Sequence, residues 1–113
     1  DVLAEAGVVW RGRRRPALQT LARRVSLLMN VHVDDLTSAA RQQELVMARR
    51  LLATSAVREA GRSVTEVAQF LSRDKGQVSR LVAQGMAQMR TDPGFKALLD
   101  AMKQRGAAQA TAD

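Results

Sequence analysis

The sequence contains no cysteine, no tyrosine, a single histidine and few aromatic residues. Without cysteine it has neither disulfide bonds nor thiolate metal ligands, which favours a cytoplasmic location. His32 alone cannot form a two-histidine metal site, and no GxxxxGK[ST] loop is present to bind a nucleotide. No apolar run approaches the length of a membrane span. We therefore expect no metal, no cofactor, no small-molecule ligand, no membrane partner and no enzymatic activity in this chain.

Lysine is also scarce, because the basic residues are almost all arginines. The formal net charge is +7, and lysine occurs only at positions 75, 96 and 103. A guanidinium group can donate two parallel hydrogen bonds to phosphate oxygens, so an arginine-rich surface favours a phosphate-bearing partner. The alternative is a basic surface that only keeps the protein soluble.

The length of 113 residues corresponds to one domain. We expect an amino-terminal arm or linker over residues 1–15, which includes the basic run "RGRRR". A helical domain is expected over residues 16–105, followed by a disordered tail over residues 106–113. Residue 1 is not methionine, so we expect the chain to be a fragment or the carboxy-terminal domain of a longer protein.

Apolar residues recur at helical spacing along most of the chain, and no useful stretch alternates in the manner of a strand. Ser63 and Glu66 have the spacing of a capping box, and Asp92 before Pro93 is typical of a helix start. The sequence predicts an all-α protein, a compact bundle of about six helices. The helices are expected at residues 16–30, within 31–38, at 40–59, 63–71 and 75–89, and from 93 onward.

The segment "SVTEVAQFLSRDKGQVSRLVAQGM" predicts two helices joined by a short polar turn, the arrangement of a helix-turn-helix. On a helical wheel, Val78, Leu81, Val82, Gly85 and Met89 form an apolar inner face of the second helix. The opposite face is small, polar and basic, as a helix in the DNA major groove requires. The alternative is an ordinary helical hairpin with a solvated face.

The outer face of this second helix supplies the residues that we predict to read base edges. Arg80 can donate two hydrogen bonds to guanine, and Gln77 can pair with the donor and acceptor of adenine. The small Gly76 permits a close approach to the bases. The predicted base-reading residues are Lys75, Gly76, Gln77, Arg80 and Gln84.

Other basic residues are predicted to bind phosphates, and so to position a duplex without reading its sequence. Asp74, at the start of the second helix, either caps that helix or accepts a hydrogen bond from a cytosine amino group. The predicted phosphate-binding residues are Arg73 and Ser79 near the motif, Arg41, Arg49 and Arg50 on the long helix, and Arg13, Arg14 and Arg15 in the arm.

The segments "ARQQELVMARRLL" and "SVTEVAQFLSRDKGQVSRL" resemble the carboxy-terminal DNA-binding domain, domain IV, of the bacterial replication initiator DnaA, a Trp-repressor-like helix-turn-helix domain. The resemblance covers roughly residues 21–89. Residues 40–42 match the Ala-Arg-Gln of that family, and "RD" at 73–74 with Val78 matches its signature Arg-Asp-His-Thr-Thr-Val. Residues 75–77, "KGQ", replace the His-Thr-Thr, so the resemblance implies the fold but not recognition of the family's replication-origin box.

The segment "VREAGRSVTEVAQFLSRDKGQVSRLVAQG" is more similar to the variant of this domain at the carboxy-terminus of REP-associated tyrosine transposases. The resemblance implies sequence-specific binding to double-stranded DNA, as the nucleoid-associated DNA-binding end of a transposase-like or replication-initiator-like protein. Transposase chemistry would belong to another region, because this chain has no tyrosine. The alternative function is a helical protein-interaction or dimerisation module with a basic surface, although nothing in the sequence indicates oligomerisation.

Overall fold

The computed structural model describes residues 16–112, with side chains through Lys103. This part of the chain contains six α-helices and one π-helical segment, and no strand. The predicted all-α class and the expectation of about six helices are therefore confirmed. The helices are α1 (Leu18–Met29), α2 (Val33–Leu36), α3 (Gln43–Thr54), α4 (Val64–Leu71), α5 (Lys75–Thr91) and α6 (Pro93–Ala112), and the π-helical segment Ser55–Glu59 directly follows α3.

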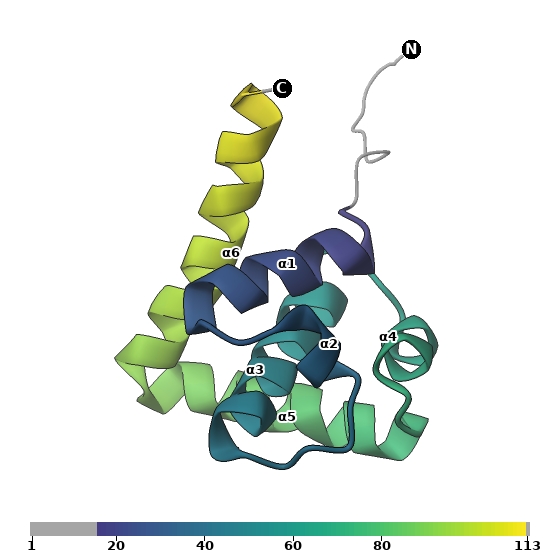
Figure 1. Cartoon of the computed structure of the whole chain (residues 1–113). Helices are drawn as coiled ribbons and strands as arrows, with labels where there is room; N and C mark the ends of the chain where they lie inside the picture. The colour runs from purple at the N-terminus through teal and green to yellow at the C-terminus, as the bar shows by residue number, and fades with distance from the viewer. Residues whose placement is uncertain (1–15, 113) are drawn as a thin grey trace.

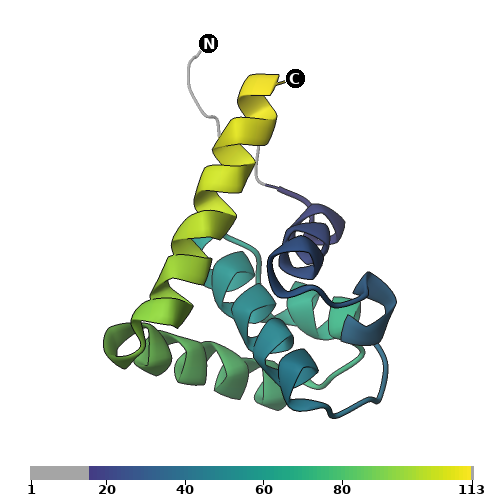
Figure 2. The same cartoon turned by 60° about the vertical axis from the view of Figure 1, so that its left-hand side comes forward.

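Helix α3 lies in the middle of the bundle (Figures 1 and 2). It packs most extensively against α5, and it also contacts α1, α2, α4 and α6. Leu51 and Leu52 of α3 are fully buried, and burial of one such side chain contributes about 1.5–3 kcal/mol to folding. The core that surrounds them includes Val25, Leu36, Val67, Leu71, Val78 and Phe95.

The long helix begins later than the sequence predicts, at Gln43 instead of Ala40. Before it, the Ser38 hydroxyl donates to the Asp35 carbonyl at 2.8 Å and accepts from the Ala40 amide at 3.2 Å. Hydrogen bonds from a serine side chain to nearby backbone compete with helix formation. Residues 37–42 consequently form a loop between α2 and α3.

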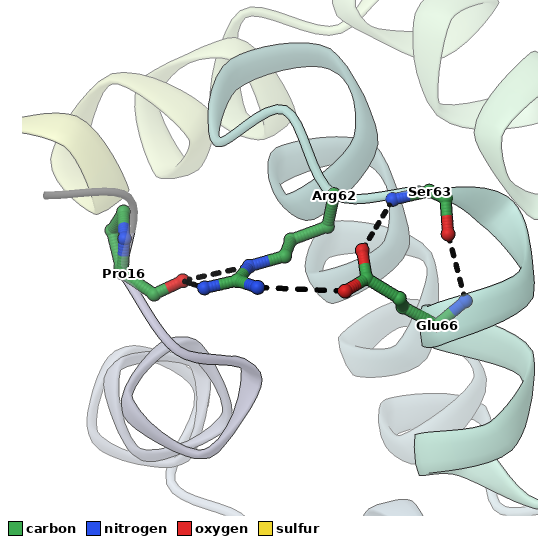
Figure 3. A network of polar contacts seen from close by, with 4 residues as sticks. All are labelled: Pro16, Arg62, Ser63 and Glu66. Atoms are coloured by element: carbon green, nitrogen blue, oxygen red, sulfur yellow. Dashed lines mark hydrogen bonds and ion pairs between the residues drawn. The ribbon is translucent and has the colours of Figure 1, made fainter. Parts of the chain in front are cut away.

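Hydrogen bonds connect the start of α4 to the segment that precedes α1. Ser63 Oγ accepts from the Glu66 amide at 3.0 Å and the Glu66 carboxylate accepts from the Ser63 amide at 2.8 Å, which confirms the predicted capping box. Arg62 donates to the Pro16 carbonyl from Nε at 3.1 Å and from Nη2 at 3.0 Å, and it also contacts Glu66 (Figure 3). The sequence predicts a helix from Pro16, but its carbonyl binds Arg62 and the helix begins at Leu18.

Helix α6 begins as predicted and extends further than predicted. Asp92 Oδ1 accepts from two amides of the first turn at 2.9 and 3.2 Å, and Pro93 is the first helical residue. The sequence predicts disorder for residues 106–113, whereas α6 continues through Ala112. Alanine and glutamine are good helix formers, and the single Gly106 costs only about 1 kcal/mol relative to alanine. The distal part of α6 projects away from the other helices (Figures 1 and 2).

Candidate nucleic-acid interface

Helices α4 and α5 are joined by a turn of three residues, 72–74. Ser72 adopts a left-handed backbone conformation, with φ 57°, and its amide donates to the Ala68 and Gln69 carbonyls at the end of α4. Asp74 caps α5, because its Oδ1 accepts from the Gln77 amide at 2.8 Å. Of the two roles expected for Asp74, the structure shows the cap. The first turn of α5 is therefore fixed relative to α4.

The inner face of α5 packs as the helical wheel predicts. Val78 is fully buried and Gly85 is buried, while Leu81, Val82 and Met89 are partly buried against the core. At Gly85 the helix approaches α3 so closely that an added Cβ would lie 1.9 Å from Thr54 Oγ1. The inner face of α5 is therefore held on α3, and the opposite face is left in solvent.

The outer face of α5 is exposed along its whole length. The side chains of Lys75, Arg80 and Gln84 have no hydrogen bond or ion pair among residues 16–103, and α5 contains no aspartate or glutamate. All five predicted base-reading residues belong to this face, which we call the α5 outer face. Its exposed residues are Lys75, Gly76, Gln77, Ser79, Arg80, Ala83, Gln84, Ala87 and Arg90.

Arg90 is a member of the α5 outer face that the sequence analysis missed. It is exposed and lies in the last turn of α5, beyond the expected end of the helix near residue 89. Its position continues the series 76, 80, 83, 87, 90, in which each residue follows the previous one by three or four positions. The same spacing rule, carried one step further, would have identified it.

The structure does not favour the predicted phosphate contact of Arg49, because its guanidinium group lies inside the protein. Its exposed fraction is 4%. Nε donates to the Leu36 carbonyl at 2.8 Å, and Nη2 donates to the carbonyls of Asp35 and Ser38 at 2.9 and 3.0 Å. Burial lowers the pKa of Arg49, the nearby charge of Arg73 lowers it further, and Asp35 raises it. Arg49 therefore holds the α2 region and the 37–42 loop against α3.

Arg73 also binds backbone carbonyls instead of projecting from the surface. Nη1 donates to the Leu71 carbonyl at 2.9 Å, and Nη2 donates to the Ser38 carbonyl at 2.8 Å. The side chain is partly buried. Its donors are thus engaged between the turn and the 37–42 loop, and the predicted phosphate contact is not what this geometry favours.

Arg50 is the third arginine whose predicted phosphate role the structure does not favour. Its Nη1 donates to Gln88 Oε1 at 2.6 Å, and the Gln88 amide donates in turn to Asp92 Oδ2 at 2.9 Å. Asp92 caps α6. Arg50 therefore links α3 to the corner between α5 and α6.

The remaining predicted phosphate-binding residues divide into two groups. Ser79 lies on the α5 outer face, and Arg41 is exposed in the 37–42 loop. The loop is held next to the turn before α5 by the bond from Arg73 to Ser38, so Arg41 and the α5 outer face belong to neighbouring segments. Arg13, Arg14 and Arg15 lie outside the described residues.

The structure also bears on metal ions, membranes and the single histidine. No group of three or more histidine, cysteine, aspartate or glutamate side chains within it is arranged to hold a metal ion. No helix among residues 16–112 has both the length and the hydrophobicity of a membrane span. His32, the only histidine of the sequence, is exposed and occupies the position before α2.

A comparison with protein-family models gives no match, and a search of curated proteins gives none either. The resemblance to the DnaA and transposase-associated domains therefore rests on the sequence motifs alone.

Proposed function

We propose that this chain binds double-stranded DNA by placing α5 in the major groove, with α4, the turn and α5 acting as a helix-turn-helix. The observation that carries the proposal is the α5 outer face, which is exposed, contains Lys75, Arg80 and Arg90, and has no carboxylate of its own. The nearby carboxylate of Asp74 is bound to the Gln77 amide as the helix cap. The major groove of B-DNA is about 12 Å wide and admits one α-helix. Because the inner face of α5 is packed on α3, the helix would enter the groove as a rigid element.

Base recognition is assigned to the amino-terminal half of α5. Arg80 has the donors for the two acceptors of guanine, and Gln77 has the donor and acceptor that match adenine. A Cβ added at Gly76 would lie 3.2 Å from Asp74 Oδ1 and 3.8 Å from Arg80 Nη1, so the glycine leaves room between these two side chains. Lys75 precedes Gln77 on this surface, and Gln84 follows Arg80 one turn further along α5.

Phosphate binding is assigned to exposed donors at the edges of this surface. Ser79 lies in the amino-terminal half of α5, and Arg90 lies near its end. Arg41 belongs to the loop that Arg73 joins to the turn before α5. With a rise of 1.5 Å per residue, Lys75 and Arg90 are about 22 Å apart along the helix, a span that exceeds the groove width. The ends of α5 are therefore suited to contact the backbones on either side of the groove. Arg13, Arg14 and Arg15 of the arm complete the proposed phosphate-binding set.

The resemblance stated above supports the same function from the sequence. In a transposase-like or replication-initiator-like protein, this chain would supply DNA binding, and catalysis would belong to another region. The "KGQ" sequence at 75–77 lies on the proposed base-reading surface. The proposed target is therefore a sequence other than the replication-origin box of the DnaA family.

A selection from randomised DNA duplexes with the purified chain tests this proposal. We expect enrichment of one short motif, bound with an affinity that falls steeply as salt is raised. Competition between DNA duplexes and poly-glutamate distinguishes DNA binding from the alternative function, a helical protein-interaction module for an acidic partner. If no motif is enriched and the polypeptide is preferred to every duplex, the DNA-binding proposal is wrong.

A further inference from the structure

Two arginines from different segments converge on one backbone carbonyl beside the proposed interface. Arg49 Nη2 and Arg73 Nη2 both donate to the Ser38 oxygen, at 3.0 and 2.8 Å. Arg49 belongs to α3, Arg73 to the turn before α5, and Ser38 to the 37–42 loop. We call this arrangement the Ser38 contact. It connects the loop, the central helix and the turn at a single atom.

Each arginine in the Ser38 contact also binds a second carbonyl that fixes its guanidinium group. Arg73 spans Leu71 and Ser38, and Arg49 reaches Leu36 and Asp35 in addition to Ser38. A planar guanidinium group presents several donors in a fixed fork, whereas the ammonium group of lysine is a compact point charge. The contact therefore depends on the shape of arginine as well as on its charge.

The Ser38 contact brings two positive charges together in a partly buried place. A carbonyl oxygen has two lone pairs and can accept from both groups, but like charges in proximity repel each other. The second arginine therefore adds a hydrogen bond to the Ser38 carbonyl and, at the same time, an electrostatic repulsion between the two guanidinium groups. The contact fixes Ser38, three residues before Arg41 in the 37–42 loop, against the turn that precedes α5.

We infer that Arg73, supported by Arg49, is a positioning residue that aligns the 37–42 loop with the α5 outer face, so that Arg41 and α5 contact the same duplex as one preformed surface. This inference rests on the proposed DNA-binding function. A loop that is ordered before binding loses little conformational entropy when the complex forms. Arg73 thus acts on binding through Arg41 and not through a phosphate of its own.

Limited proteolysis tests the loop position without DNA. Trypsin cleaves after Arg41 in the loop and after Arg50 inside α3, so the ratio of the two rates separates local opening from global unfolding. Loss of hydrogen bonds from a charged donor corresponds to about tenfold or more in a local opening equilibrium. We expect Arg73→Ala and Arg73→Lys to raise the ratio by about that factor, and Arg90→Ala, which removes an exposed arginine, to leave it unchanged. An unchanged ratio in both Arg73 variants would overturn the inference.

A double-mutant cycle between Arg41 and Arg73 tests the consequence for binding. On the selected duplex, Arg41→Ala is expected to weaken binding by about tenfold in the natural chain and by less than about twofold in the Arg73→Ala background, because residues that act as a unit are not additive. Arg73→Lys is expected to bind as poorly as Arg73→Ala. Additive losses, together with recovery of binding by the charge-preserving lysine, would show a direct phosphate contact and contradict the positioning role.

The two experiments separate failure of this inference from failure of the proposed function. If the natural chain enriches no duplex and prefers poly-glutamate to every duplex, DNA binding is wrong, and the positioning role in binding falls with it even where the proteolysis ratio changes. If the natural chain binds a selected duplex but the ratio or the cycle fails as described, DNA binding stands and the positioning role does not.

Discussion

At the scale of single residues, the arginines divide by what their guanidinium groups bind. Arg49, Arg50 and Arg73 donate to groups of the protein itself, whereas Arg80 and Arg90 are exposed on α5. A guanidinium that is already hydrogen-bonded to carbonyls has fewer donors to offer a phosphate. The exposed arginines are therefore the ones whose removal we expect to change DNA binding directly.

Replacement of Arg80 by alanine tests the base-reading assignment. We expect Arg80→Ala to weaken binding to the selected duplex by about 1–3 kcal/mol and to relax the preference at one base pair, because a bidentate contact to guanine is lost. Titration of the selected duplex and of its single-base variants measures both effects.

Arg23→Ala is the matched control for Arg80→Ala. Arg23 is exposed on α1, which lies on the other side of α3 from α5 (Figure 1). The control is expected to retain the base preference of the natural chain. An equal loss on every duplex for Arg80→Ala would assign Arg80 to phosphate and not to a base.

At the scale of elements, close packing and caps determine how α5 and α6 are held. Gly85 allows α5 to approach Thr54 of α3, where an added Cβ would lie 1.9 Å from Oγ1. Thr54 is 1% exposed and its hydroxyl donates to the Arg50 carbonyl at 2.8 Å. At the other end of α5, Asp92 accepts from the Gln88 side chain and caps α6. Both features predict measurable effects on stability.

Gly85→Ala is expected to destabilise the fold. Alanine is favoured over glycine in a helix by about 1 kcal/mol, but the new methyl group meets a buried side chain that has no room to move, and overpacking of this kind costs about 1–3 kcal/mol. We therefore expect a lower midpoint of urea unfolding. Thr54→Ala in the same chain removes Oγ1, the nearest atom, so the double variant should be less destabilised than the sum of the single variants. A raised midpoint for Gly85→Ala alone would contradict the close approach of the two helices.

The cap of α6 predicts a loss of stability in acid. Hydrogen bonds from the Gln88 side chain, and from the Phe95 and Gly94 amides, lower the pKa of Asp92 and outweigh the opposing effect of burial. A carboxyl group whose pKa is lower in the folded than in the unfolded chain contributes stability above its unfolded pKa, near pH 4, and loses it as the pH falls through the lowered folded pKa. Urea unfolding at a series of pH values measures this contribution.

Asp92→Asn provides the comparison for that titration. The asparagine side chain keeps an oxygen that can accept from the first amides of α6, but it does not titrate. We expect the difference in stability between the natural chain and Asp92→Asn to shrink as the pH falls below about 4. A difference that stays constant from neutral pH to acid would show that the Asp92 charge does not contribute.

At the scale of the whole molecule, we expect the proposed DNA binding to depend on the exposed positive charges more than on the net charge. The formal net charge of the chain is +7, but several arginines are hydrogen-bonded to other groups of the protein. The proposed phosphate-binding residues come from three regions: the arm, the 37–42 loop and the two ends of α5. The salt dependence of DNA binding measures how many of them act.

Replacement of Arg13, Arg14 and Arg15 together by alanine tests the contribution of the arm. Each phosphate neutralised on B-DNA adds about 0.9 to the slope of log affinity against log salt concentration. We therefore expect the slope to become shallower by about 0.9 for each of these arginines that contacts phosphate, with the enriched motif unchanged. Arg50→Ala, which removes a partly buried arginine bound to Gln88, should leave the slope unchanged. A changed motif in the arm variant would show that the arm reads bases.

The features that the sequence alone determined are local ones. The capping box of Ser63 and Glu66, the start of α6 at Pro93 and the outward face of α5 all depend on residues three or four positions apart, which a helix brings together wherever it lies. The extent of α6 was underestimated, because residues 106–112 were judged by what they can bury and not by their helix propensity.

The tertiary structure decided which groups the arginine side chains bind. Arg49 and Arg73 bind Ser38, 11 and 35 residues away, and Arg50 binds Gln88, 38 residues away. An arginine side chain is long enough to reach solvent or an interior carbonyl, and its immediate neighbours in the sequence do not specify which acceptor folding will bring within reach. Local spacing therefore predicted the face that α5 presents, while only the packing of α3, the turn and the 37–42 loop decided which positive charges remain on that surface.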